Sequence, residues 1–116
     1  MGEIFFSPCD VFLDETTNAV QPDIIFISSR NLPLIGDDAI HGVPDMLLEV
    51  LSPGNPQHDL GRKKELYQKF QVKEYWIIDP DTNETFGFIL KDGKYVNSGR
   101  LRGRIKSTLL NQEFEF

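Results

Sequence analysis

Three short runs of almost uninterrupted apolar residues constrain the fold of this chain more than any other feature. They are residues 24–27 (Ile-Ile-Phe-Ile), residues 46–51 (Met-Leu-Leu-Glu-Val-Leu) and the Tyr-Trp-Ile-Ile core of Glu74–Asp79. A strand that is apolar without alternation has both of its faces covered, as in the buried strands of α/β proteins. Turn residues at 52–56 end the second run, and Pro80 ends the third. With 116 residues in all, the chain can form one such core.

A single helix is expected between the second and third runs, from about Leu60 to Phe70 with Asp59 as its N-cap. At about 100° per residue, the side chains of Leu60, Leu66, Tyr67 and Phe70 share one face of this helix. A helix that connects two strands of one sheet packs its apolar face on that sheet and lets the second strand run parallel to the first. We therefore expect a crossover helix and a parallel return strand.

Further strands are expected on both sides of this central unit. They lie at residues 4–6 continuing through 11–13, at 85–90, at 95–96 and, singly or as a pair, within 100–116, while 29–44 forms a loop. Asp92-Gly93 between two of them is a strong hairpin signal. The sequence thus predicts an α/β domain with a mixed sheet of antiparallel strands, a crossover helix, a parallel return strand and a C-terminal hairpin.

Three charged residues stand where this pattern predicts burial. Glu49 interrupts the second apolar run, and a buried carboxylate must meet a cation, a metal or a proton. Asp23 opens the preceding strand, so antiparallel pairing could place both carboxylates on one side of the sheet. Lys63 projects from the middle of the apolar helix face, toward the strand that carries Glu49. We expect the three side chains to converge.

Two interpretations of this trio remain open. The first is a buried ion pair between Glu49 and Lys63 whose role is packing. The second is a divalent cation held by Asp23 and Glu49, because hard cations prefer carboxylate, carbonyl and water oxygens. The metal would then lower the pKa of a bound water and polarise a phosphodiester oxygen, and Lys63 would orient the water or stabilise developing charge.

The same residues lie in four stretches that occur in the order found in a known family. The stretches are residues 20–26, 43–53, 59–67 and 74–80. Through them, residues 2–78 resemble the Uma-type family of restriction endonucleases, which are members of the PD-(D/E)XK nuclease superfamily. The resemblance implies a restriction-endonuclease-like core that cuts DNA. It also implies one or two Mg²⁺ (or Mn²⁺) ions held by Asp23, Glu49 and the backbone carbonyl of Val50, with Lys63 as the third catalytic residue.

The sequence departs from the family pattern in two places. The superfamily usually carries its lysine two residues after the glutamate, where this chain has Leu51, and the resemblance implies that Lys63 on the following helix takes that role. The family also has an N-terminal region before the strand at residues 2–6, and this region includes a helix with an acidic residue that can complete the site. We therefore expect a single domain over residues 1–116, truncated at its N-terminus relative to the family. The alternative function is a catalytically inactive nuclease fold that serves as a dimerisation or partner-binding module, and a homodimer is expected.

Several other polar residues are weaker candidates for the site. Asp45 shares strand parity with Glu49 and is either a second metal ligand or the polar start of the strand, and Ser52 either ends that strand or donates a hydrogen bond in the site. Alternating cations would line one strand face as a phosphate-contacting stripe or as a solvated edge that discourages sheet pairing. They are Arg100, Arg102, Arg104 and Lys106. Tyr67 and Trp76 are expected in the core between helix and sheet.

The overall composition restricts the class of protein. The net charge is −6 and the pI about 4.8, which counts against nucleic-acid binding through a generally basic surface and leaves room for a local basic stripe. One cysteine, Cys9, excludes an internal disulfide framework. No apolar run approaches the roughly 20 residues of a membrane span, and the N-terminus lacks the pattern of a secretion signal. We expect a cytoplasmic protein without a membrane partner.

Overall fold

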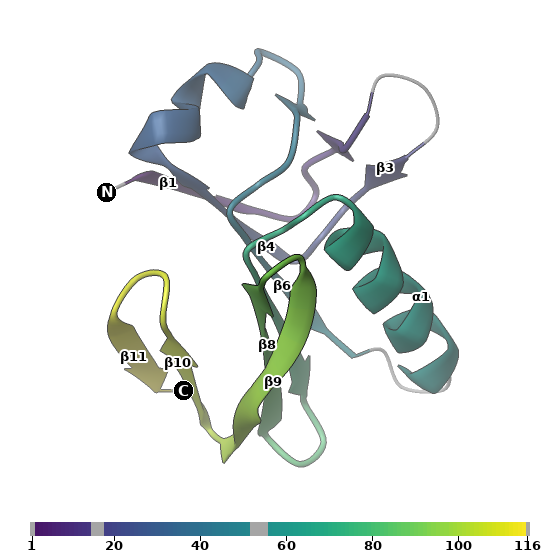
Figure 1. The fold of residues 1–116 in the computed structure, drawn as a ribbon, viewed down its shortest axis with the longest axis vertical. Helices are drawn as coiled ribbons and strands as arrows, with labels where there is room; N and C mark the ends of the chain where they lie inside the picture. The colour runs from purple at the N-terminus through teal and green to yellow at the C-terminus, as the bar shows by residue number, and fades with distance from the viewer. Residues whose placement is uncertain (1, 15–17, 52–55, 116) are drawn as a thin grey trace.

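A mixed six-stranded sheet forms the centre of the molecule (Figure 1). The computed structural model describes residues 2–14, 18–51 and 56–115, with the main chain alone at 56–60. In spatial order the strands are β1 (Gly2–Phe6), β4 (Ile24–Ser28), β6 (Met46–Val50), β7 (Glu74–Asp79), β8 (Glu84–Lys91) and β9 (Lys94–Arg102). Helix α1 (Pro56–Lys69) connects β6 to β7, which pair in parallel, and the other neighbouring pairs are antiparallel. The predicted mixed α/β sheet with its crossover helix and parallel return strand is confirmed.

Two smaller sheets flank the central one. Strands β2 (Val11–Phe12), β3 (Ala19–Val20) and β5 (Ile40–His41) form the first, in the order β3-β2-β5, and β10 (Arg104–Ser107) with β11 (Gln112–Glu115) forms the second. The hairpin of β8 and β9 turns at Asp92 and Gly93, which both have positive φ as a type I′ turn requires. In Figure 1 the β10–β11 hairpin and α1 lie on opposite sides of the central sheet.

Three predicted boundaries are wrong. The first strand does not continue to residue 13, because β1 and β2 belong to different sheets and Pro8 between them has no N–H for a ladder. The predicted loop contains a 3₁₀ helix, Ser29–Leu34, and β5. Helix α1 begins at Pro56, so Asp59 lies inside it and is not the N-cap. Proline is favoured at the first helical position, where its missing N–H costs nothing.

Apolar side chains cover both faces of the central strands, as their composition predicted. On the face toward α1, the core includes Ile25, Leu47 and Tyr75, together with Tyr67 from the helix. The opposite face carries Phe26, Leu48 and Trp76, covered by Ile105 from β10. The placement of Trp76 between helix and sheet is therefore wrong, since strand parity turns it away from α1.

A buried glutamate attaches the C-terminal hairpin to the sheet. Glu74 is 1% exposed; its Oε1 accepts a hydrogen bond from Trp76 Nε1 at 2.6 Å, and its Oε2 accepts one from the main-chain N of Leu109 at 2.9 Å. The two acceptors of one carboxylate thus satisfy an indole of β7 and a main-chain amide of the turn between β10 and β11. Within the described residues, no helix is long and apolar enough to cross a membrane.

Candidate active site

The register of two neighbouring strands brings Asp23 and Glu49 to the same level of the sheet. Ile24 pairs with Leu48 in the antiparallel ladder of β4 and β6. Asp23 directly precedes Ile24 and Glu49 directly follows Leu48, so the two acids come next in the same register. Directly opposite residues of an antiparallel pair project to the same face. Glu49 meets α1 on this face, whereas the Asp23 carboxylate contacts the main chain of β6 and, among the described residues, forms no hydrogen bond or ion pair with Lys63.

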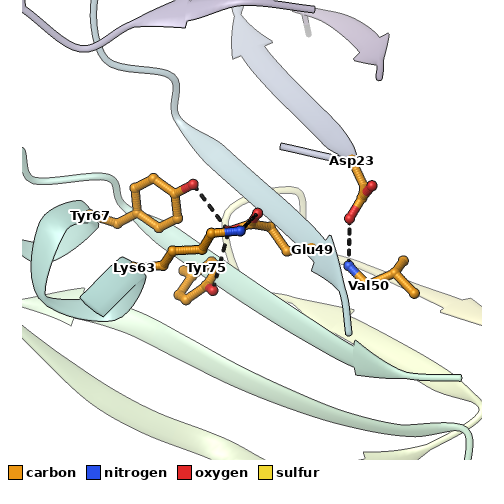
Figure 2. Close-up of polar contacts among 6 residues, drawn as sticks. All are labelled: Asp23, Glu49, Val50, Lys63, Tyr67 and Tyr75. Carbon is orange, nitrogen blue, oxygen red and sulfur yellow. Dashed lines mark hydrogen bonds and ion pairs between the residues drawn. The ribbon is translucent and has the colours of Figure 1, made fainter. Parts of the chain in front are cut away.

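Glu49 is held by three donors from two other elements. Its side chain is 8% exposed, and its Oε1 accepts a hydrogen bond from Lys63 Nζ at 2.7 Å. Its Oε2 accepts hydrogen bonds from the hydroxyl groups of Tyr67 at 3.1 Å and Tyr75 at 3.4 Å. Figure 2 shows the Glu49 carboxylate turned toward the lysine and the two tyrosine rings. The predicted contact between the strand carboxylate and the helix ammonium is present.

Both tyrosines remain donors to this carboxylate. Burial in the core, followed by the charge of Glu49, raises the pKa of Tyr67 above its ordinary value, and the same causes raise the pKa of Tyr75. Their rings meet edge to face with centroids 4.9 Å apart. A protonated hydroxyl on each ring therefore fixes the orientation of the Glu49 carboxylate.

Asp23 is oriented by the main chain of the neighbouring strand. Its Oδ2 accepts a hydrogen bond from the main-chain N of Val50 at 2.7 Å (Figure 2). The ladder of β4 and β6 ends at Ile24, and the Asp23 side chain supplies the next acceptor for β6. Its other oxygen, Oδ1, has no hydrogen-bond donor among the described residues. One oxygen is thus used for positioning and the other is left for a further ligand.

The donor atoms present here suit a hard divalent cation. Asp23 and Glu49 are at neighbouring positions of β4 and β6, although their carboxylates have different partners, and the carbonyl of Val50 follows Glu49 in sequence. Mg²⁺ commonly keeps several waters and binds proteins through only one or two carboxylates. In the part of the chain that the structure describes, no group of three His, Cys, Asp or Glu side chains could hold a metal. A metal at this place would therefore rely on two carboxylates, the carbonyl and water.

Asp45 belongs to another part of the structure. It lies at the opposite end of β6, four residues or roughly 13 Å of strand from Glu49. Its oxygens accept hydrogen bonds from the main-chain N of Ser28 at 2.7 Å and from Asn31 at 2.9 Å, and Lys73 lies 3.4 Å away. Asp45 is therefore placed as the polar start of the strand, with contacts to Ser28, Asn31 and Lys73 and none to Glu49 among the described residues.

The four alternating cations do not line one strand. β9 ends at Arg102, Gly103 has a φ of 69°, and Arg104 starts β10 in a separate sheet. Arg100 forms an ion pair with Glu84, and Arg104 forms one with Glu113 at 3.1 Å. The predicted continuous stripe is wrong because a glycine with left-handed backbone breaks the strand in its middle. Ser52 lies outside the described residues.

Tyr67 was predicted only as a core residue, and no role in the site was predicted for Tyr75. Tyr75 pairs with Leu47 in the parallel ladder, so it shares the face and the neighbourhood of Glu49. A usable signal was present, because a buried tyrosine hydroxyl needs a polar partner and Glu49 is the polar residue of the adjacent strand. Both hydroxyl groups belong to the site as positioning groups.

Comparisons with known proteins agree with this fold. The chain is similar to a crystal structure from Anabaena variabilis ATCC 29413 that is described as a "putative nuclease belonging to DUF820". The TM-score is 0.63 at 20% sequence identity, over 83% of this chain and 54% of the other, so this chain spans about half the length of that protein. No curated protein matches the sequence. Residues 1–114 match the Uma2 family, whose description is "Putative restriction endonuclease", and the chain belongs to that family.

Proposed function

We propose that this chain is a metal-dependent nuclease domain that hydrolyses phosphodiester bonds in DNA. Membership of a family described as restriction endonucleases supports the reaction class and the substrate. The observation that carries the proposal is the position of Asp23 and Glu49 at one level of two adjacent strands, with Lys63 bonded to Glu49. Two acids can hold a divalent cation, and an ammonium beside one of them can orient a water or stabilise developing charge during phosphodiester hydrolysis.

Each residue of the site has a distinct role in this proposal. Mg²⁺ or Mn²⁺, held by Asp23, Glu49 and the Val50 carbonyl, would supply a more acidic bound water and neutralise charge on the phosphate. The Val50 amide and the hydroxyl groups of Tyr67 and Tyr75 hold the two carboxylates in place. Lys63 has a flexible ammonium group with three donors, which orients the attacking water or a phosphate oxygen.

A second candidate function is a catalytically inactive nuclease fold that binds a partner or dimerises. It is favoured by the three hydrogen bonds that Glu49 already accepts within the protein. In this case the Glu49–Lys63 pair is a metal-free structural contact. A homodimer remains a prediction, which sedimentation or size-exclusion with light scattering would measure.

Cleavage assays distinguish the two functions. Supercoiled plasmid, a linear DNA duplex and an RNA oligonucleotide are incubated with the protein in Mg²⁺, in Mn²⁺ and in EDTA. The proposed function predicts DNA cleavage that requires the metal and is lost in Glu49→Gln and Asp23→Asn, while Asp37→Asn, which changes an exposed loop carboxylate, cleaves as wild type. Absence of cleavage by the wild-type chain, or cleavage that survives in Glu49→Gln, contradicts the proposal.

A further inference from the structure

A cleft of about 510 Å³ lies between β3 and helix α1, and the lysine of the site is one of the residues that line it. It is lined by Asn18, Val20, Arg62, Lys63, Glu65, Leu66 and Lys69. In Figure 1, β3 lies beside α1 on the side of the central sheet that the helix covers. Lys63 belongs both to this cleft and to the Glu49 ion pair, so the cleft borders the candidate active site at this lysine.

The helix presents a spaced pair of cations to the cleft. Arg62, Glu65, Leu66 and Lys69 stand at i, i+3, i+4 and i+7 and therefore share one side of α1. Arg62 and Lys69 are exposed, and neither forms an ion pair with any residue in the described ranges. Seven residues of helix separate them by about 10 Å along the helix axis.

The charges of the cleft contrast with those of the whole chain. Apart from Lys63, whose charge is matched by Glu49, the lining has two cations and one anion, in a protein with a net charge of −6. Arginine and lysine recognise phosphate by a planar fork and a point charge respectively. By comparison, Arg100 and Arg104 each face a carboxylate and have their charge neutralised within the protein.

We propose that this cleft binds the sugar–phosphate backbone of the nucleic-acid strand that is cut. The proposal rests on the proposed function, because it places one phosphate of the strand at Lys63 beside Glu49. Arg62 and Lys69 then contact phosphates of the same strand. These contacts carry no base specificity, since phosphate groups are identical along the strand.

Binding to labelled oligonucleotides in EDTA tests this inference without requiring catalysis. Fluorescence anisotropy measures the affinity for a single strand and a duplex of the same sequence over a range of salt concentrations. The variant Arg62→Ala/Lys69→Ala is compared with Arg30→Ala/Lys94→Ala, which also removes one exposed arginine and one exposed lysine but from outside the cleft. Circular dichroism and thermal unfolding confirm that both variants are folded.

The cleft variant is expected to bind at least about tenfold more weakly, with a salt dependence whose slope is lower by about two. The control is expected to bind within about twofold of wild type. Equal losses in the two variants, or no loss in the cleft variant, overturn the inference, as does a wild-type chain that binds neither oligonucleotide.

The same variants separate this inference from the proposed function. Metal-dependent cleavage with unchanged binding in the cleft variant would refute the cleft and leave the nuclease intact. Cleft-dependent binding without cleavage in Mg²⁺ or Mn²⁺ would support the cleft and refute the hydrolysis.

Discussion

The Glu49 carboxylate and the Lys63 ammonium lie 2.7 Å apart, and they are buried to very different degrees. The glutamate side chain is 8% exposed and the lysine side chain 38%. A carboxylate inside the core is thus connected to solvent through a single flexible cation. Because the lysine keeps contact with water, this pair is screened more than a fully buried one. The ammonium can serve the interior carboxylate and a ligand in the cleft alike.

Replacing Lys63 by methionine leaves Glu49 with its two tyrosine donors and no cation. We expect the free energy of unfolding to fall by about 1–3 kcal/mol, since a hydrogen bond to a charged group is lost at a mostly buried acceptor. Urea unfolding followed by the fluorescence of Trp76 measures this change. The double variant Glu49→Gln/Lys63→Met should lose less than the sum of the two single variants. A neutral or stabilising effect of Lys63→Met would show that Glu49 does not depend on the lysine.

The three tyrosines of the chain should resist ionisation in alkaline solution. Burial is the largest cause that raises the pKa of Tyr67, Tyr75 and Tyr95, and for the first two the charge of Glu49 adds to it. Since the folded pKa values lie above the unfolded value of about 10, this stabilisation is present below pH ~10 and is lost as the pH rises beyond it.

Tyrosinate absorbance measures that resistance directly. The folded protein should show little of it near pH ~10, and the absorbance should appear together with unfolding. In guanidinium chloride the same chain should titrate near the ordinary value. Development of most of the tyrosinate signal near pH ~10 with the fold intact would mean that the hydroxyl groups do not lie in the core beside Glu49.

Asp45 makes the stability of the protein depend on pH at the acid end. Burial alone would raise its pKa, but hydrogen bonds from Ser28 and Asn31 and the charge of Lys73 outweigh burial and lower the pKa below its ordinary value. Protonation therefore favours the unfolded chain. The contribution of Asp45 is complete above pH ~4 and is lost as the pH falls through the folded pKa.

The substitution Asp45→Asn tests this dependence. At pH ~7 it should cost about 1–3 kcal/mol, and the difference from wild type should shrink as the pH falls below ~4. Urea unfolding over this pH range gives the measurement, with Asp37→Asn as a control that stays close to wild type throughout. A difference that is constant with pH would show that the charge of Asp45 contributes nothing.

The central sheet and the Glu49–Lys63 contact could both be predicted because each depends on strong local signals. Uninterrupted apolar runs specify strands covered on both faces, and a charge inside such a run must be compensated. The helical period then directs Lys63 toward the sheet. These arguments need only the strand and helix periods and the helical connection between β6 and β7.

What could not be predicted depends on which elements meet in space. Strand parity shows that Trp76 and Tyr75 face opposite sides, but it does not say that β10 covers one side and α1 the other. The break at Gly103 is a matter of backbone conformation, and residue alternation continues through it unchanged. Strand parity also placed Asp45 on the same face as Glu49, but the two residues lie about 13 Å apart along the strand.

Calorimetric titration of Mg²⁺ and Mn²⁺ tests most directly whether Asp23 and Glu49 form a metal site. Asp23→Asn keeps an acceptor for the Val50 amide, and Glu49→Gln keeps an acceptor for the tyrosine hydroxyl groups, so both variants should fold. We predict that the wild-type chain and Asp37→Asn bind the metal at millimolar concentration, and that each site variant abolishes binding. No uptake by the wild-type chain, or equal uptake by all four proteins, would contradict the proposed metal site.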